Sequence, residues 1–185
     1  MSYTPMSDLG QQGLFDITRL LLQQPDLAAL SETLTRLVQQ SALADEAAII
    51  LWNAGNHRAA RYACDEAGHP VSYEDETVLA HGPVRRLLSR PDALHCDHET
   101  FADTWPQLIR SGLYRPFGYY SLLPLAADGR IFGGCEFLRR DNRPWSEKEF
   151  QRLHTFAQIV AVVTEQIQNR VSNCLLYTSD AADEL

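Results

Sequence analysis

The chain has 185 residues, of which 45% are hydrophobic and 22% charged, with a formal net charge of −8, a composition that suits one globular domain of ordinary size. No apolar run approaches the ~20 residues of a membrane span, and residues 1–13 lack the basic and apolar regions of a signal peptide. We therefore predict a cytoplasmic protein with no membrane partner. The 16 basic residues are scattered, with Lys148 the only lysine, so we expect no direct contact with nucleic acid.

Two helices and a β-hairpin are predicted for the first third of the chain. Apolar residues recur at helical spacing in residues 8–23, and again from Leu27 to Val38 after a start signal at Pro25-Asp26. The hairpin follows, with strands at residues 48–52 and 58–64 joined by turn residues at 53–56.

The middle of the chain is irregular and rich in turn residues. Residues 73–76 (Tyr-Glu-Asp-Glu) are interpreted as a solvated acidic turn. Pro83 suits the first turn of a helix that runs through Ser89 and stops before Pro91. A short strand is predicted at residues 92–96, followed by a helix that starts at Asp97 or His98 and is interrupted at Pro106.

Residues 95–98 (His-Cys-Asp-His) group three types of metal ligand within four positions. Zinc or iron would need further ligands from elsewhere, and adjacent residues of a strand point to opposite faces. We prefer the alternative of a strand end that leads into a helix N-cap, and predict no metal and no cofactor. The four cysteines form no CxxC pair and are predicted to be reduced thiols: Cys64, Cys96, Cys135 and Cys174.

A second strand pair, in residues 118–140, is the strongest β signal of the chain. Two β-rich runs are joined by Asp128-Gly129, a dipeptide typical of hairpin turns. Gly133 and Gly134 lie inside the second run, where they indicate a bulge or, alternatively, a ligand close to the backbone.

The last predicted element is a long helix that runs to Val171. Ser146 and Glu149 have the spacing of a capping box at its start. Strands paired by hairpins imply an antiparallel sheet, and the helices come from the two ends of the chain. The predicted fold class is therefore α+β.

The stretch SLLPLAADGRIFGGCEFLRRDNRPWSEKEFQRLHTFAQIVA resembles the end of a GAF domain, and the two early helices followed by AAIILWNA fit the same pattern. The resemblance implies an antiparallel sheet of five to six strands, with the terminal helices on one side and short helices and loops on the other. The stretches MSYTPMSDLGQQGLFDITRLLLQQPDLA and IFGGCEFLRRDNRPWSEKEF resemble the N-terminal sensory region of σ54-dependent transcriptional activators that respond to formate.

Such activators carry an AAA+ ATPase and a helix-turn-helix beyond their sensory region. The chain holds no G-x-x-x-x-G-K-[ST] phosphate loop, so neither ATP hydrolysis nor operator binding is assigned to it, and we expect no enzyme activity. The expected organisation is an N-terminal helix at residues 1–23, a GAF-like domain with a long signalling helix at 24–171, and a non-native tail at 172–185. Residues 174–185 resemble a translated sequencing adaptor; a natural disordered tail is the alternative.

The resemblance also implies a ligand, formate, between the sheet and the irregular middle segment. The helix that opens at His81-Gly82 would offer the amide groups of Val84 and Arg85, with the positive end of the helix dipole behind them. Arg85 or Arg86 could supply a forked donor, and one of two adjacent tyrosines a hydroxyl, although surface arginines and core tyrosines are the ordinary alternatives. The expected ligand-binding residues are His81, Gly82, Val84, Arg85, Arg86, Tyr119, Tyr120 and Cys135.

A second hypothesis assigns the domain no small molecule. In it, the terminal helices pack against those of a second copy, so the domain serves as a homodimerisation and interaction module.

Overall fold

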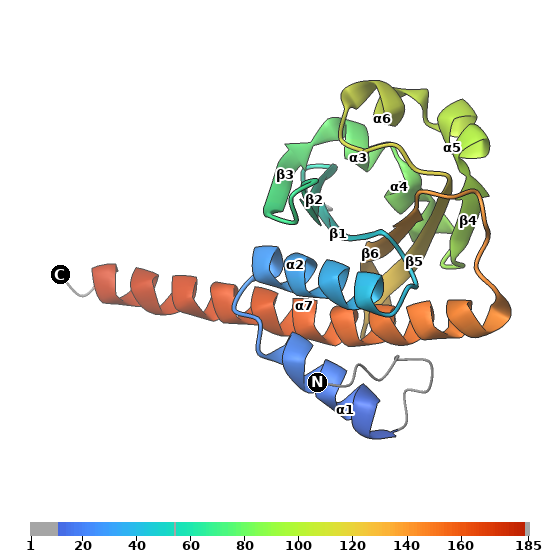
Figure 1. Ribbon diagram of the computed structural model, residues 1–185. Helices are drawn as coiled ribbons and strands as arrows, with labels where there is room; N and C mark the ends of the chain where they lie inside the picture. The colour runs from blue at the N-terminus through green and yellow to red at the C-terminus, as the bar shows by residue number, and fades with distance from the viewer. Residues whose placement is uncertain (1–10, 54, 184–185) are drawn as a thin grey trace.

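The structure, a computed structural model, describes residues 11–53 and 55–183 (Figure 1). One antiparallel sheet of six strands, in the order β3-β2-β1-β6-β5-β4, has helices on both faces. The strands are β1 (Glu46–Asn53), β2 (Arg58–Cys64), β3 (Pro70–Glu76), β4 (Leu94–Asp97), β5 (Tyr119–Ala127) and β6 (Arg130–Arg139).

The first face of the sheet is covered by helices from the two ends of the chain, α2 (Leu27–Gln40) and α7 (Glu147–Asp183), and α1 (Gln11–Leu22) packs against these two helices on the side away from the sheet. Helix α2 begins at Asp26, whose carboxylate accepts a hydrogen bond of 2.8 Å from the amide of Ala29. Its apolar stripe, with Leu30 and Leu34 fully buried, packs in one core with inward residues of β1, β5 and β6 and with α7.

The opposite face carries four short helices: α3 (Thr77–Ala80), α4 (Pro83–Ser89), α5 (His98–Thr104) and α6 (Pro106–Ser111). Pro83 and Pro106 each stand at the start of a helix, where a missing amide hydrogen is tolerated. A second core, centred on Phe101 and Tyr120, fills the space between these helices and the sheet. The predicted α+β fold, with terminal helices on one side and short helices on the other, is confirmed.

The predicted local signals appear in the structure with two exceptions. The amide of Ser146 donates to the Glu149 carboxylate at 2.8 Å, and the amide of Glu149 donates to the Ser146 hydroxyl at 3.2 Å, which is the capping box. Residues 73–76, however, are the end of β3 and not an acidic turn. Helix α7 also continues past Val171 to Asp183, because no helix breaker follows Val171.

The two strand glycines have different neighbours. The β5–β6 register shifts beside Gly133, so the bulge interpretation is confirmed. A Cβ added at Gly133 would lie 2.2 Å from the carbonyl oxygen of Ile50. At Gly134 a Cβ would lie 3.1 Å from the side chain of Leu87 on α4, so here a helix approaches the backbone.

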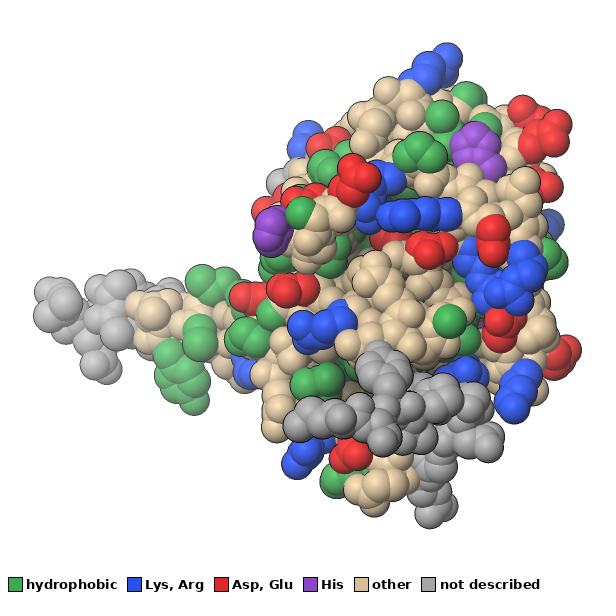
Figure 2. Space-filling view, in the orientation of Figure 1, with side chains coloured by type: hydrophobic (Ala, Val, Ile, Leu, Met, Phe, Trp, Pro, Cys, Tyr) green, Lys and Arg blue, Asp and Glu red, His purple; other side chains and the backbone are tan. Residues whose placement is uncertain are grey.

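Helix α7 extends beyond the sheet at its C-terminal end (Figure 1). Its 37 residues correspond to about 55 Å. Hydrophobic side chains are exposed on the projecting part, including Val171, Leu175 and Tyr177 (Figure 2). Among the described residues, no helix is both long and apolar enough to cross a membrane.

Candidate functional site

Half of the predicted ligand-binding residues gather around helix α4. His81, Gly82, Arg85 and Arg86 line an open surface pocket of about 320 Å³, together with Ser89, Arg90 and Trp105. A neighbouring pocket of about 500 Å³ shares His81 and Arg85 and adds Trp52 and His57. Among the described residues that line these two pockets none is acidic, so this surface of α4 is cationic in a chain whose net charge is negative.

One of the two α4 amides that the sequence predicts for anion binding already has a partner. The amide of Arg85 donates to the carbonyl of Gly82 at 3.1 Å, so it is not free. Val84 is fully buried in the second core, and a Cβ on Gly82 would lie 2.7 Å from the side chain of Leu108. The prediction of a free amide at Arg85 is therefore wrong, and Gly82 at the start of α4 packs against Leu108 of α6. The Arg85 guanidinium instead lies 3.1 Å from the His81 ring.

The remaining predicted residues lie on both faces of the sheet, because neighbouring strand positions alternate. Tyr120 faces the short helices, whereas the ring of Tyr119 lies 5.8 Å from that of Trp145 at the start of α7. Cys135 is fully buried in the core under the terminal helices, and burial raises the pKa of its thiol well above the ordinary value. Including Tyr119 and Cys135 in one site with the α4 residues was wrong.

The possible metal ligands at residues 95–98 also point to different places and do not form one site. Asp97 caps α5 by accepting a hydrogen bond of 2.8 Å from the amide of Thr100, so the N-cap interpretation is confirmed. Cys96 is buried under the short helices, and the His95 ring lies 3.0 Å from the hydroxyl of Ser121.

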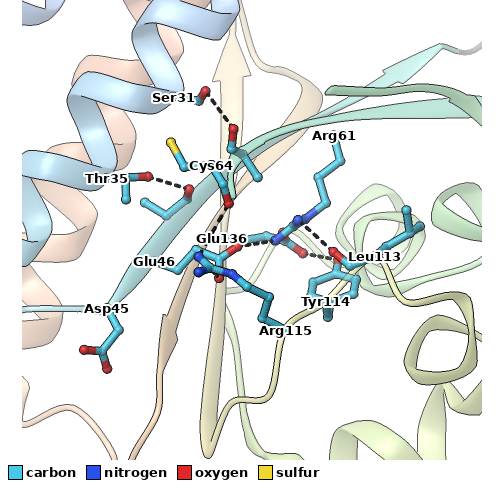
Figure 3. A network of polar contacts seen from close by, with 12 residues as sticks. Ser31, Thr35, Asp45, Glu46, Arg61, Cys64, Leu113, Tyr114, Arg115 and Glu136 are labelled. Carbon is cyan, nitrogen blue, oxygen red and sulfur yellow. Dashed lines mark hydrogen bonds and ion pairs between the residues drawn. The ribbon is translucent and has the colours of Figure 1, made fainter. Parts of the chain in front are cut away.

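A buried network of charges between the sheet and the segment after α6 escaped the sequence analysis (Figure 3). Its centre is Arg61 on β2, which is 1% exposed, and Glu136 on β6, which is 0% exposed. The Arg61 Nε donates to Glu136 Oε2 at 2.7 Å. Two phenol hydroxyls donate to the other oxygen, Oε1: that of Tyr114 at 2.5 Å and that of Tyr120 at 2.7 Å.

The outer half of this network contains a second acid and a second arginine. Arg61 Nη2 donates to Glu46 Oε1 at 3.2 Å, and Arg115 Nη2 donates to Glu46 Oε2 at 3.1 Å. Arg61 Nη1 donates to the carbonyl of Leu113 at 3.1 Å, and its guanidinium carbon lies 4.3 Å from the centre of the Tyr114 ring. Two arginines therefore face two glutamates, and their formal charges balance.

The electrostatics keep the donors in their donating form. Burial by itself would lower the pKa of Arg61, but the nearby carboxylates of Glu136 and Glu46 raise it above its ordinary value. Burial, and then the Glu136 charge, raise the pKa of both Tyr114 and Tyr120 well above the ordinary value. The three groups around Glu136 thus hold their protons at neutral pH and point them at one carboxylate.

Comparison with known proteins identifies the family to which this fold belongs. The model of the GAF domain family matches residues 26–163. The chain belongs to the GAF domain family.

This GAF domain is 73% identical over 177 residues to the formate hydrogenlyase transcriptional activator of Salmonella typhimurium strain SL1344. It is 70% identical over 177 residues to the formate hydrogenlyase transcriptional activator FhlA of Escherichia coli K12. Both alignments cover 96% of this chain and 26% of the relative. The chain therefore spans about a quarter of the length of these curated relatives, which are themselves transcriptional regulators.

Solved structures have the same fold at low sequence identity. The GAF domain of a phosphoenolpyruvate-protein phosphotransferase from Acinetobacter gives a TM-score of 0.64 at 16% identity, covering 89% of this chain and 97% of the other. The free methionine-R-sulfoxide reductase of Neisseria meningitidis gives 0.61 at 12% identity, covering 92% and 96%. At these identities the likeness shows the fold alone.

The buried network of the GAF domain did leave a signal in the sequence. Arg61 and Glu136 are charged residues at inward positions of strands that are otherwise apolar on that face. Charged residues are almost never fully buried unless they are paired. An arginine and a glutamate on separate inward strand positions therefore indicate a pair, although the sequence does not say which strands bring them together.

Proposed function

We propose that this GAF domain is the signal-sensing part of a σ54-dependent transcriptional activator, and that formate is its signal. The observation that carries the proposal is the identity of 70–73% over 96% of the chain to two activators of formate hydrogenlyase. The ATPase that such a sensor would control lies outside this chain, in which no phosphate-loop motif occurs.

The chemistry of the described residues supports a regulatory role over a catalytic one. Three of the cysteines are buried, and burial raises the pKa of Cys64, Cys96 and Cys135, which disfavours the nucleophilic thiolate. The buried charges of Arg61 and Glu136 are already paired with each other. We therefore propose that the domain binds its ligand without transforming it.

The size of formate limits the affinity of such a sensor. The best very small ligands gain about −1.5 kcal/mol per heavy atom, so the three heavy atoms of formate give about −4.5 kcal/mol. This corresponds to a dissociation constant of roughly 0.5 mM at best. The cationic surface of α4, with Arg85, Arg86 and His81, is where we expect the anion to be attracted first.

The second candidate function, a homodimerisation module, is favoured by apolar residues on the terminal helices. Phe15 and Leu14 on α1 are 63% and 39% exposed, and Val162 on α7 is 52% exposed. A groove of about 160 Å³ between α1 and α7 is lined by Leu14, Ile17 and Phe156, among others. Dimerisation and ligand sensing are compatible, because a ligand can shift the packing of terminal helices.

Thermal unfolding at two protein concentrations distinguishes the candidates. Sodium formate at tens of millimolar should raise the melting temperature, whereas acetate or chloride at equal ionic strength should not raise it as much. A melting temperature that rises with protein concentration but ignores formate would contradict sensing and support the interaction module.

A further inference from the structure

We propose that Arg61, Tyr114 and Tyr120 form a receptor for a small carboxylate, in which the side chain of Glu136 is the resident ligand. Glu136 then acts as a built-in competitor that raises the formate concentration to which the domain responds. This inference rests on the proposed function for the identity of the ligand, whereas the receptor itself is argued from its geometry.

The contacts of Glu136 are those expected of a bound carboxylate. Oε2 accepts from Arg61 Nε at 2.7 Å, and Oε1 accepts from the hydroxyls of Tyr114 and Tyr120 at 2.5 and 2.7 Å. Charge-assisted hydrogen bonds of this length are the strong ones. Formate has the same O–C–O group, so it can accept the same set of donors.

The donors are held in place by groups other than Glu136. Arg61 comes from β2 and is also bonded to Glu46 and to the carbonyl of Leu113. The rings of Tyr114 and Tyr120 lie 5.5 and 4.7 Å from that of Phe101 in the second core. The receptor is therefore preorganised, and it should keep its shape when the Glu136 side chain is absent.

The limited space around the network means that formate and the Glu136 carboxylate compete for the same donors. A crevice of about 10 Å³ leads from solvent to the outer half of the network and is lined by Glu46, Arg115 and Phe117, among others. This volume corresponds to about one water-sized probe, so formate does not fit in the crevice, and the Glu136 side chain itself is 0% exposed. A ligand that reaches the three donors must take the place of that side chain.

The test is the Glu136→Ala variant, which removes the resident carboxylate and leaves the donors. Thermal unfolding is followed while sodium formate or sodium acetate is added at constant ionic strength, with chloride as the reference. Formate and acetate should both stabilise the variant, and the formate midpoint should be about tenfold or more below that of the unmodified domain, since no competitor occupies the site. Adding Tyr120→Phe to this variant should weaken the response.

The matched control is Glu46→Ala, which removes a carboxylate from the same arginine but leaves Glu136 and both tyrosines in place. If formate stabilises the Glu46→Ala variant as much as the Glu136→Ala variant, or stabilises neither more than chloride does, the receptor is disproved. If Glu136→Ala is too unstable to purify, its refolding yield from urea into formate, acetate or chloride gives the same comparison.

The outcome is separable from the test of the proposed function. An unmodified domain that ignores formate contradicts formate sensing, yet the Glu136→Ala variant can still reveal the receptor. A formate response in the unmodified domain with no gain in the variant has the opposite meaning: it supports sensing elsewhere in the molecule, and overturns the receptor at Arg61.

Discussion

Arg61 and Glu136 form a salt bridge of 2.7 Å between two strands that are not neighbours in the sheet. Arg61 lies on β2 and Glu136 on β6, with β1 between them, so the pair crosses over β1 on the face covered by the short helices. Both side chains are 2% exposed or less. The pair therefore joins the two hairpins of the domain in an environment where neither charge can be solvated.

We predict that Arg61→Met destabilises the domain by about 3–5 kcal/mol, because it leaves two buried carboxylates without their shared partner. The measurement is urea unfolding at neutral pH. Arg143→Met is the matched control: Arg143 is 60% exposed in its ion pair with Glu149, so its loss should change stability by less than about 1 kcal/mol. Similar effects for the two variants would show that the buried pair contributes no more to the free energy of unfolding than an exposed one.

The ion pair of 2.8 Å between Arg139 on β6 and Glu149 on α7 predicts that the stability of the domain depends on pH. Burial would raise the pKa of Glu149, but hydrogen bonds from the amide of Ser146 and from Arg139 outweigh it and lower the pKa below the ordinary value of 4.5. A carboxyl whose pKa is lower in the folded chain stabilises the fold above the unfolded pKa, and loses this effect as pH falls through the folded value. Glu149→Gln should thus destabilise the domain clearly at pH 7 and much less at strongly acidic pH, as measured by urea unfolding at each pH. An equal loss at both would mean that the Glu149 charge is irrelevant.

Local signals explain which parts of this fold the sequence could predict. Asp26, Ser146 and the Asp128-Gly129 turn each act on residues within one turn of themselves, and each appears as expected. Strand β3 was missed because it is an edge strand, where charged residues such as Glu74 are tolerated and mask the apolar alternation.

The residues of the candidate site also differ in whether short stretches of sequence or the strand order bring them together. His81, Arg85 and Arg86 belong to one short segment, so a local argument is enough to place them in one pocket. Arg61 and Glu136 are 75 residues apart in sequence, and only the strand order places them in contact. Their pairing depends on β1 lying between β2 and β6, which no short stretch of residues specifies.

The two glycines of β6 give a prediction about the backbone. A Cβ at Gly133 would lie 2.2 Å from the carbonyl oxygen of Ile50, whereas the nearest atom at Gly134 belongs to the side chain of Leu122, at 2.5 Å. A side chain can rotate away more easily than a strand can shift, so Gly133→Ala should be the more damaging change, within the ~1–3 kcal/mol typical of overpacking. Chemical unfolding of both variants checks this. A greater loss for Gly134→Ala would indicate that α4 cannot adjust over the sheet.

The exposed apolar residues of the terminal helices give the last prediction. If α1 and α7 pair with those of a second copy, Phe15→Glu places a charge in that interface and should convert dimers to monomers, because an unpaired charge is costly to bury there. Light scattering after size exclusion measures the mass directly. Leu88→Glu is the control, since Leu88 is also exposed, at 39%, but lies on α4 on the opposite face of the sheet. Equal masses for all three proteins would argue against dimerisation through α1, and a monomeric Leu88→Glu variant alone would place the contact on the face of the short helices.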